Sequence, residues 1–232
     1  MDPFSPLLEH AAEFAAEWHA GTYRKSRWRP CPYLPPAEQC DGPPEDAVRV
    51  PMVAHVTSVA MTVLRAGFPD ETVAAAFLHD VLEDANQFGQ TISAAELAAL
   101  FGREVVEQVE TVSEPKRGAD GRMLPWKQRK DSYVRALASG PLGAAAISLA
   151  DKLHNLWTMN EGLAAGCDIF ARTRYPDGSP RGLSAGPEQQ RWYFNAVIAA
   201  TEAHTDPRLD VLRDRLRAEL ARFDALTGAL AR

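Results

Sequence analysis

The chain has few cysteines, and their number and spacing do not suggest a disulfide-stabilised scaffold. Three cysteines among 232 residues are an odd number at irregular spacing, which is typical of proteins in a reducing compartment. Cys31 and Cys40 lie in one loop and could pair or bind a metal, but they lack the close spacing of a zinc site. The cysteines therefore favour a cytoplasmic protein without a structural zinc ion.

Long apolar runs and an excess of positive charge are also missing. No apolar run approaches the length of a membrane span, and residues 1–6 contain no basic segment followed by an apolar one, so we predict no membrane helix and no secretory signal. The net charge of −6 argues against nucleic acid or an anionic membrane as the main partner. With 46% hydrophobic and 24% charged residues, the chain can bury a sizeable core. We expect a cytoplasmic protein whose partner is a small molecule.

Helical signals repeat along the chain, and strand signals do not. Asp70 and Ser93 are plausible N-caps, and Gly67, Gly102 and Gly140 are plausible helix stops. The sequence predicts an all-α helical bundle that forms one domain over residues 1–232, interrupted by a Pro-rich insertion at 29–51 and a Gly/Pro-rich segment at 173–187. The predicted helices cover residues 5–20, 52–66, 70–84, 93–101, 103–113, 126–138, 141–164, 187–203 and 208–227, the last being a C-terminal helix.

The most informative segment is residues 78–84, which places one imidazole and three carboxylates in an otherwise apolar stretch. At an advance of about 100° per residue, His79, Asp80, Glu83 and Asp84 would share one face of a helix. Three acids this close raise one another's pKa unless a cation compensates. Histidine and aspartate together supply the donors that Mn, Fe or Zn accepts. The segment therefore predicts a metal site between helices; the alternative is an acidic patch on a solvated helix face.

Two other apolar helices supply candidate metal ligands. His55 stands at the head of the helical pattern at 52–66, and Asp151 stands in the middle of the nearly continuous apolar stretch at 144–156. An unpaired carboxylate buried there would cost several kcal/mol, so Asp151 needs a partner. Taken alone, His55 could be a helix-cap histidine, and Asp151 could pair with a lysine or an arginine.

Together, these residues follow the order His, His-Asp, Asp, which resembles the HD phosphohydrolase superfamily. The sequence His79-Asp80-Val81-Leu82-Glu83-Asp84 resembles the HDxxED box of the alarmone hydrolases, meaning the hydrolase half of the RelA/SpoT enzymes and the stand-alone small alarmone hydrolases. The resemblance covers roughly residues 7–200 and implies an HD-domain helical bundle. Further matches are Arg24-Lys25, residues 70–76, residues 126–130 with Tyr133, residues 149–156 and residues 192–194.

The resemblance implies a metal-dependent hydrolase that removes the 3′-pyrophosphate from the guanosine alarmones ppGpp and pppGpp, which releases pyrophosphate and GDP or GTP. One Mn²⁺, with Fe²⁺ or Zn²⁺ as alternatives, would lower the pKa of a bound water and neutralise phosphoryl charge. Glu83 and Asp84 would be the catalytic pair, with water activation assigned to Asp84 and proton transfer to the leaving sugar oxygen assigned to Glu83. The implied metal ligands are His55, His79, Asp80 and Asp151.

A polyanionic substrate requires cations, and the chain places them in local clusters. The resemblance implies that Arg24 lies against the purine ring, that Asn155 contacts the nucleoside and that Tyr193 flanks the base. The alternatives are solvated surface charges, an Asn155 amide satisfied by backbone, and Tyr193 as part of the core. The complete set of expected substrate-binding residues is Arg24, Lys25, Lys130, Lys152, Asn155 and Tyr193.

The sequence departs from the family on the side that would read the nucleoside. Close relatives have a short link ending in His-Pro where this chain has its Pro-rich insertion and reads His55-Val56, and Gln189 stands where an arginine is common. Base preference and phosphate number therefore stay open. The alternatives are a hydrolase of the adenosine alarmones (p)ppApp, another HD-type nucleotide phosphohydrolase, and a protein that is not an enzyme but an antitoxin-like binding partner of an alarmone synthetase. We expect no synthetase or regulatory domain in the chain.

Overall fold

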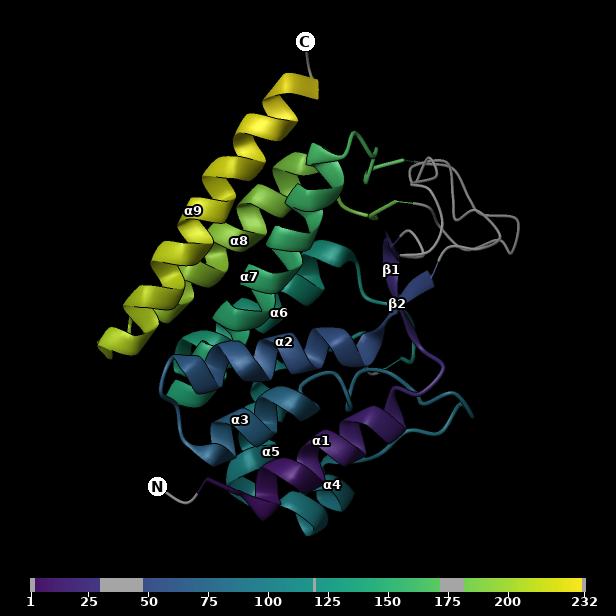
Figure 1. The fold of residues 1–232 in the computed structure, drawn as a ribbon, viewed down its shortest axis with the longest axis vertical. Helices are drawn as coiled ribbons and strands as arrows, with labels where there is room; N and C mark the ends of the chain where they lie inside the picture. The colour runs from purple at the N-terminus through teal and green to yellow at the C-terminus, as the bar shows by residue number, and fades with distance from the viewer. Residues whose placement is uncertain (1–2, 30–47, 119, 172–181, 231–232) are drawn as a thin grey trace.

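The computed structural model describes residues 3–29, 48–118, 120–171 and 182–230, without the side chains of residues 25–29, 48–49 and 229–230. The described part folds into helices joined by loops, with one small strand pair (Figure 1). The helices are α1 (Pro6–Trp18), α2 (Met52–Arg65), α3 (Asp70–Leu78), α4 (Ala94–Phe101), α5 (Arg103–Val112), α6 (Trp126–Ser139), α7 (Leu142–Ala164), α8 (Pro187–Thr201) and α9 (Pro207–Leu230). The prediction of an all-α fold is confirmed.

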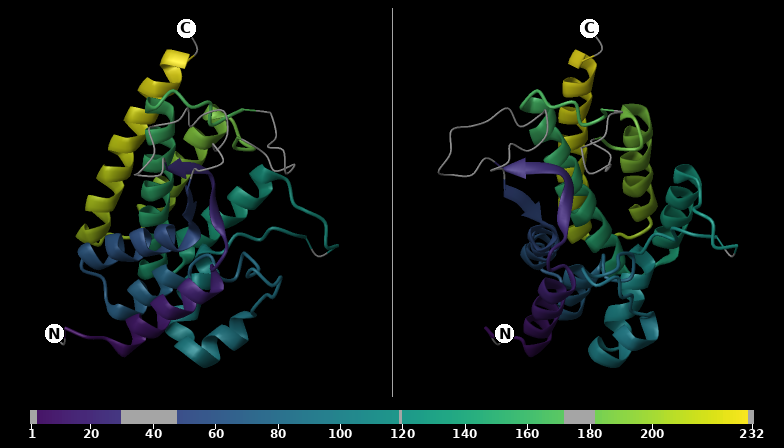
Figure 2. Two further views of the ribbon diagram at one scale, coloured as in Figure 1. Left: turned by 45° about the vertical axis from the view of Figure 1, so that its right-hand side comes forward. Right: turned by 90° about the vertical axis from the view of Figure 1, so that its right-hand side faces the viewer.

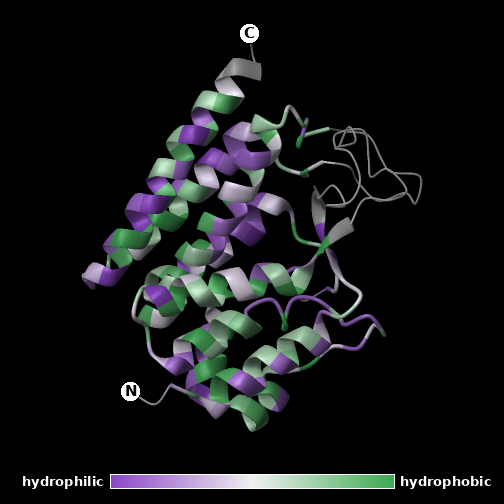
Figure 3. Ribbon diagram, viewed as in Figure 1, coloured by the Kyte–Doolittle hydropathy of each residue, from purple (hydrophilic) through white to green (hydrophobic). Residues whose placement is uncertain are grey.

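The long helix α7 is the centre of the bundle. It packs against α2, α5, α8 and α9, while α3 packs against α1, α2 and α5. The views in Figures 1 and 2 show α9 running along α7 and α8, with α1, α3, α4 and α5 grouped on the other side of α2. Hydrophobic and hydrophilic residues alternate along most of these helices (Figure 3). Most of the buried hydrophobic residues of the helices form one core cluster, as expected when burial of apolar faces drives packing.

Small residues allow the central helices to approach closely. Residues 74–76 of α3 and residues 144–146 of α7 are alanines with no exposed surface. A Cβ added at Gly143 would lie 1.8 Å from Oε1 of Gln108 on α5 and 2.7 Å from Oγ1 of Thr72 on α3, so a larger residue there would force these side chains to move. Because interiors are packed at crystal-like density, the residues that follow these runs are held in defined positions. Those following residues are the candidate site residues.

The predicted helix at 70–84 is wrong in its second half. Helix α3 ends at Leu78, and residues 80–84 form tight turns in which the amides of Val81 and Glu83 donate to the carbonyls of Leu78 and Asp80. A continued helix would place three carboxylates at its negative C-terminal end, which is unfavourable. Asp70 is also not an N-cap, because Pro69 holds that position. Ser93 is confirmed as the N-cap of α4, where it forms a capping box with Glu96.

A two-stranded antiparallel ribbon, which the sequence did not predict, precedes α2. It consists of β1 (Tyr23–Arg29) and β2 (Val48–Pro51). These strands flank the Pro-rich insertion, whose residues 30–47 lie outside the described part of the chain. The amide of Met52, the first residue of α2, donates to the carbonyl of Thr22 at 3.0 Å. The ribbon therefore places Arg24 beside the first turn of α2.

Two predictions from composition have a structural counterpart. None of the described helices combines the length and the apolarity needed to cross a bilayer. Cys167 is disulfide-bonded, which runs against the reducing compartment that the cysteine count favours; the two other cysteines lie outside the described residues. The cytoplasmic location and the single-domain organisation remain predictions.

Candidate active site

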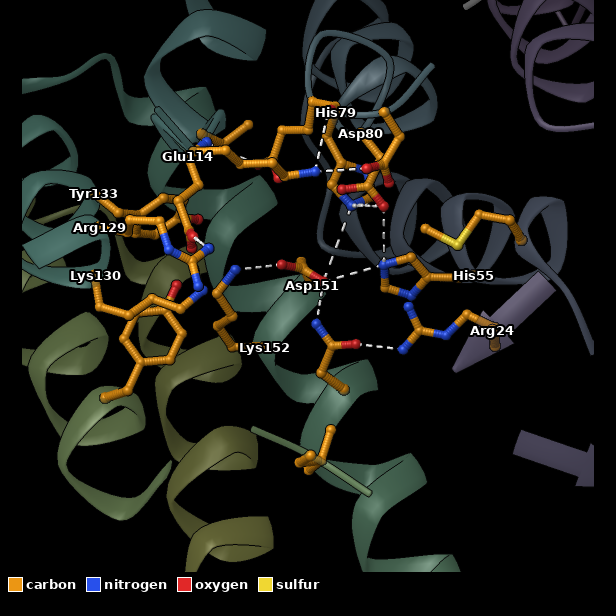
Figure 4. Close-up of a pocket in the computed structure, with 18 of the residues that line it drawn as sticks. Arg24, His55, His79, Asp80, Glu114, Arg129, Lys130, Tyr133, Asp151 and Lys152 are labelled. Atoms are coloured by element: carbon orange, nitrogen blue, oxygen red, sulfur yellow. Dashed lines mark hydrogen bonds and ion pairs between the residues drawn. The ribbon is translucent and has the colours of Figure 1, made fainter. Parts of the chain in front are cut away.

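Four polar side chains, three buried and one partly buried, come from three parts of the chain and meet where α2, the end of α3 and α7 converge (Figure 4). His55 comes from the first turn of α2, His79 and Asp80 from the turn after α3, and Asp151 from the middle of α7. His55, His79 and Asp151 are 1%, 3% and 7% exposed. The close helix contacts made by the alanine runs bring these groups together, although they lie almost 100 residues apart in sequence.

The distances among these four side chains suit a shared metal ion. Nε2 of His55 lies 3.1 Å from Oδ1 of Asp151 and 3.8 Å from Oδ2 of Asp80. Nε2 of His79 lies 3.5 Å from Oδ2 of Asp80 and 3.9 Å from Oδ1 of Asp151. Donors bound to one ion at about 2.1 Å are separated by roughly 3.0–3.4 Å. The His55, His79 and Asp80 donors lie within 4.8 Å of one another and could hold a divalent ion.

The hydrogen bonds of His79 direct its second nitrogen into this cluster. Nδ1 lies 2.8 Å from the carbonyl oxygen of Ala76 and therefore donates its proton there. In the neutral ring Nε2 is then the acceptor nitrogen, and it is buried without a hydrogen-bond partner among the described residues. A buried acceptor without a donor is costly, and a bound cation would remove that cost. This orphaned nitrogen is the strongest sign that the side chains present fit a metal ion.

The charges around the cluster favour the protonation states in which histidine and aspartate can bind a metal ion. Burial and, after it, the guanidinium of Arg24 lower the pKa of His55 to about 4, so its imidazole is neutral at neutral pH. Burial raises the pKa of Asp151, but the ammonium of Lys152 and the imidazole of His55 outweigh burial and hold that pKa well below its usual value. Neutral imidazole and ionised carboxylate are the forms that bind metals.

Asp151 is also part of a polar chain that reaches β1. Its Oδ2 forms an ion pair with Lys152, and its Oδ1 accepts a hydrogen bond of 2.5 Å from Nδ2 of Asn155. Oδ1 of Asn155 in turn accepts from Nη2 of Arg24 (Figure 4). The alternative in which backbone satisfies Asn155 is wrong, because its amide joins two side chains. Arg24 and Asp151 are therefore coupled through one residue.

Glu83 and Asp84 lie beside the cluster but in different surroundings. Oε1 of Glu83 accepts the backbone amide of Glu114 at 2.7 Å, and burial, followed by the charge of Asp80, raises the pKa of Glu83 to about 7. Asp84 is about half-exposed, and its Oδ1 lies 2.5 Å from Nζ of Lys116. Lys116 also donates to the carbonyl of Glu83 at 2.9 Å. One lysine thus fixes the turn that carries both carboxylates.

A cavity of about 400 Å³ contains the cluster. Its apolar lining includes Met52, Val112 and Leu183. The polar lining carries five lysines and arginines beside five carboxylates, so cations that can bind an anionic ligand lie next to the donor cluster. We call the lysines and arginines that line the cavity the cationic wall. They are Arg24, Lys116, Arg129, Lys130 and Lys152.

The buried carboxylate of Glu114 holds two of these cations. It forms ion pairs with Nη1 of Arg129 and Nζ of Lys130, and its side chain is only 6% exposed. Nζ of Lys130 also lies 4.5 Å from the ring centre of Tyr193. Glu114 therefore connects the cationic wall with Glu83, which its own backbone amide contacts.

The structure brings most of the sequence-predicted site residues together. Lys25 is the exception, because its side chain lies outside the described residues. Tyr193 is buried in the core, as the alternative reading held, yet it still lines the cavity. Gln189 does not line the cavity: its Oε1 accepts the amide of Gly186 at the start of α8. The predicted site residues that line the cavity are Arg24, His55, His79, Asp80, Glu83, Asp84, Lys130, Asp151, Lys152, Asn155 and Tyr193.

Sequence reasoning missed Glu114, Lys116 and His154 as parts of the site, and it included Arg129 only within the matching segment 126–130. The first two lie in the irregular segment between α5 and α6, where no helical periodicity indicates direction. His154 was visible within the apolar stretch of α7, three residues after Asp151, which is a helical neighbour spacing. That spacing was the available signal.

Comparison with known proteins places this geometry in a family. An HD domain family profile matches residues 37–172. The guanosine-3′,5′-bis(diphosphate) 3′-pyrophosphohydrolase MESH1 of Mus musculus is 33% identical over 66% of this chain and 69% of its own length. The probable enzyme of the same name in Synechocystis sp. is 29% identical over 47% of this chain, but the match covers only 14% of the Synechocystis protein.

Solved structures share the fold. The structure of a metazoan ortholog of SpoT that hydrolyzes ppGpp covers 94% of this chain and 98% of its own, with a TM-score of 0.61 at 22% identity. The crystal structure of lmo0812 from Listeria monocytogenes covers 73% of this chain and 98% of its own, with a TM-score of 0.53 at 27% identity. The family profile spans more than half of the chain. The chain therefore belongs to the HD-domain family, whose members bind divalent metals, and is a phosphohydrolase related to the MESH1-type ppGpp hydrolases at about 30% identity.

Proposed function

We propose that this chain removes the 3′-pyrophosphate from ppGpp and pppGpp, with one divalent metal ion as its cofactor. The observation that carries the proposal is the convergence of four metal donors, three of them buried, with two further carboxylates and the cationic wall on one cavity. A nucleotide is a plausible substrate for a phosphohydrolase of this family, and the relatedness to MESH1 favours the guanosine alarmones.

His55, His79, Asp80 and Asp151 would hold the metal. Two imidazoles and two carboxylates form a mixed nitrogen and oxygen set, which suits Mn²⁺ or Fe²⁺ and also accepts Zn²⁺; we propose Mn²⁺. When bound, the ion would acidify water and neutralise charge on the phosphoryl oxygens.

Glu83 and Asp84 would move the protons. Because the pKa of Glu83 is raised to about 7, a large fraction of its carboxyl groups carry a proton at neutral pH. Glu83 would donate that proton to the 3′ oxygen of the leaving nucleoside. Asp84 lies nearer to solvent, where it would accept the proton of the attacking water. Lys116 would hold both groups in place through its contacts with Asp84 and with the Glu83 carbonyl.

Different parts of the cavity would bind different parts of the substrate. Burial opposes the charge of Lys152, but the carboxylate of Asp151 raises the pKa of Lys152 well above its usual value, so this ammonium is available for phosphate oxygens. Lys130 would bind phosphate oxygens next to Lys152. The ring of Tyr193, which lies against Nζ of Lys130, would hold Lys130 in place. Arg24 and Asn155 would face the nucleoside at the opposite end. Lys25, next to Arg24 in β1, is proposed as a further phosphate contact.

A substrate panel tests the proposal. The protein, stripped with a chelator and reloaded with Mn²⁺, is incubated with ppGpp, pppGpp, ppApp and GTP, and products are separated by nucleotide chromatography. We expect GDP, GTP and pyrophosphate from the guanosine alarmones, and no release from Asp80→Ala or Asp151→Ala protein. Asp210→Ala, which removes an exposed carboxylate on α9, is the matched control and should retain activity.

Each alternative predicts a different pattern. Hydrolysis of ppApp without hydrolysis of ppGpp would support an adenosine alarmone hydrolase, which the Pro-rich insertion next to Arg24 favours. Release of phosphate from GTP alone would support another nucleotide phosphohydrolase. If Mn²⁺-loaded protein leaves every nucleotide intact, and Asp80→Ala protein still neutralises an alarmone synthetase in cells, the chain is a binding partner and the proposed reaction is wrong.

A further inference from the structure

The imidazole of a further histidine contacts His55, the proposed metal ligand on α2. The contact is on the side of the His55 ring that faces away from Asp80 and Asp151. His154 lies on α7, three residues after Asp151, and its Nδ1 is 2.8 Å from Nδ1 of His55. The two rings lie 4.8 Å apart between centres, at an interplanar angle of 50°. A contact of this length between two ring nitrogens requires one to carry a proton and the other to accept it.

The other nitrogen of His55 determines which of the two is the donor. Nε2 of His55 points to Asp151 and Asp80, so it must offer a lone pair if it binds a metal. A neutral imidazole has a single N–H, so the proton of His55 is then on Nδ1. His55 therefore donates to His154, and the proton of a neutral His154 is on its own Nε2.

We propose that His154 is a positioning residue for the metal site: its Nδ1 accepts the proton of His55 Nδ1 and so holds the His55 ring in the metal-binding tautomer and orientation. The inference rests on the proposed metal site and adds a residue to it. His79 receives the same support from a backbone carbonyl of its own helix. His55 receives it from the helix that carries Asp151, so the register of α2 against α7 sets both ligands together.

Two substitutions separate the hydrogen bond from the space that the ring fills. His154→Phe keeps a flat ring but has no acceptor. His154→Asn is smaller, but its Oδ1 occupies the position of Nδ1 along the side chain and can accept the proton. His10→Phe, at an exposed position of α1, controls for the loss of any histidine.

The first measurement is the affinity of chelator-stripped protein for Mn²⁺, followed by the electron paramagnetic resonance signal of the free ion. Loss of a partner behind a metal-binding histidine weakens binding by about 10- to 100-fold. We expect that loss for His154→Phe, nearly wild-type binding for His154→Asn, and no change for His10→Phe. Thermal melting of the stripped proteins shows whether each variant is folded.

The second measurement uses protein reloaded with Zn²⁺, a diamagnetic ion that the same set of ligands accepts. Long-range ¹H–¹⁵N correlation spectra at pH 8 report which nitrogen of His55 is protonated and whether that proton is hydrogen-bonded. We expect a downfield, hydrogen-bonded Nδ1 proton of His55 in the wild-type protein and loss of that downfield shift in His154→Phe. The inference is overturned, and the proposed function stands, if His154→Phe binds Mn²⁺ as tightly as wild type or if the Nδ1 proton of His55 in the wild-type protein is not hydrogen-bonded. If folded wild-type protein binds no Mn²⁺, both the proposed function and the inference fail.

Discussion

Replacing Glu83 by glutamine should make the metal-free protein more stable at alkaline pH while abolishing activity. Glu83 is a partly buried carboxyl whose side chain is 17% exposed, and desolvation together with the charge of Asp80 raises its pKa from 4.5 to about 7. An acid that holds its proton more tightly in the folded state is destabilising when it ionises. Glutamine has nearly the same shape and never ionises.

The size and the sign follow from the two pKa values. Below pH 4.5 the carboxyl is protonated in both the folded and the unfolded chain, and its contribution to stability is complete. That contribution is lost as the pH rises through 7. A difference of about 2.5 pKa units corresponds to about 3 kcal/mol, at 1.36 kcal/mol per unit. For a chain of this size, that is roughly 6–12 °C in Tm. The gain in the variant is smaller than this limit, because glutamine loses the charge contact of 3.5 Å with Lys116.

The assay is thermal unfolding at pH 5 and pH 8, in excess chelator so that bound metal does not offset the charge of Asp80. We expect the difference in Tm between Glu83→Gln and wild type to become more positive from pH 5 to pH 8. Glu107→Gln, at an exposed position of α5, should follow wild type at both values. Parallel melting curves for Glu83→Gln and wild type across this range would refute the reasoning, as would a variant that is less stable at pH 8 than at pH 5 relative to wild type.

Three further predictions address the cationic wall, the core and the metal. Glu114→Gln removes the partner of Arg129 and Lys130 and should destabilise the protein by about 3–5 kcal/mol, as is common when one member of a buried ion pair is lost; urea unfolding measures it, and no change would mean that these ion pairs are not formed. Leu149→Ala, at a fully buried position of α7, should cost about 2–5 kcal/mol, whereas Leu100→Ala, at a position 61% exposed, should cost less than about 0.5 kcal/mol; equal costs in denaturant titrations would contradict the packing of α7. Free Mn²⁺ at about 100 times its Kd should stabilise the protein by about 2.7 kcal/mol relative to chelated protein, and a Tm that does not respond to Mn²⁺ would contradict the metal site.

The helices could be predicted from the sequence because their signals are local. Apolar periodicity and the Ser93 cap place α4 within one residue of its observed start. The HDxxED box was harder, because periodicity cannot show where a helix stops when the following residues are polar. The box still delivers its side chains to one cavity, but it does so through turns after Leu78 and not through one helical face. The predicted convergence was right although the predicted local structure was wrong.

The sequence could not show which side chains on different helices contact one another. The spacing of Asp151 and Asn155 on α7 places both on one face, and that much was visible. That His154 meets α2 and that Lys152 lies 4.5 Å from the ring centre of Tyr133 on α6 depends on how three helices pack. Because these residues occupy consecutive turns of one buried helix, a shift of α7 would disturb the metal donors, the phosphate cations and the nucleoside contacts at once. The alanines at 144–146, which lock α7 against its neighbours, are therefore as much a part of the site as the charged residues that follow them.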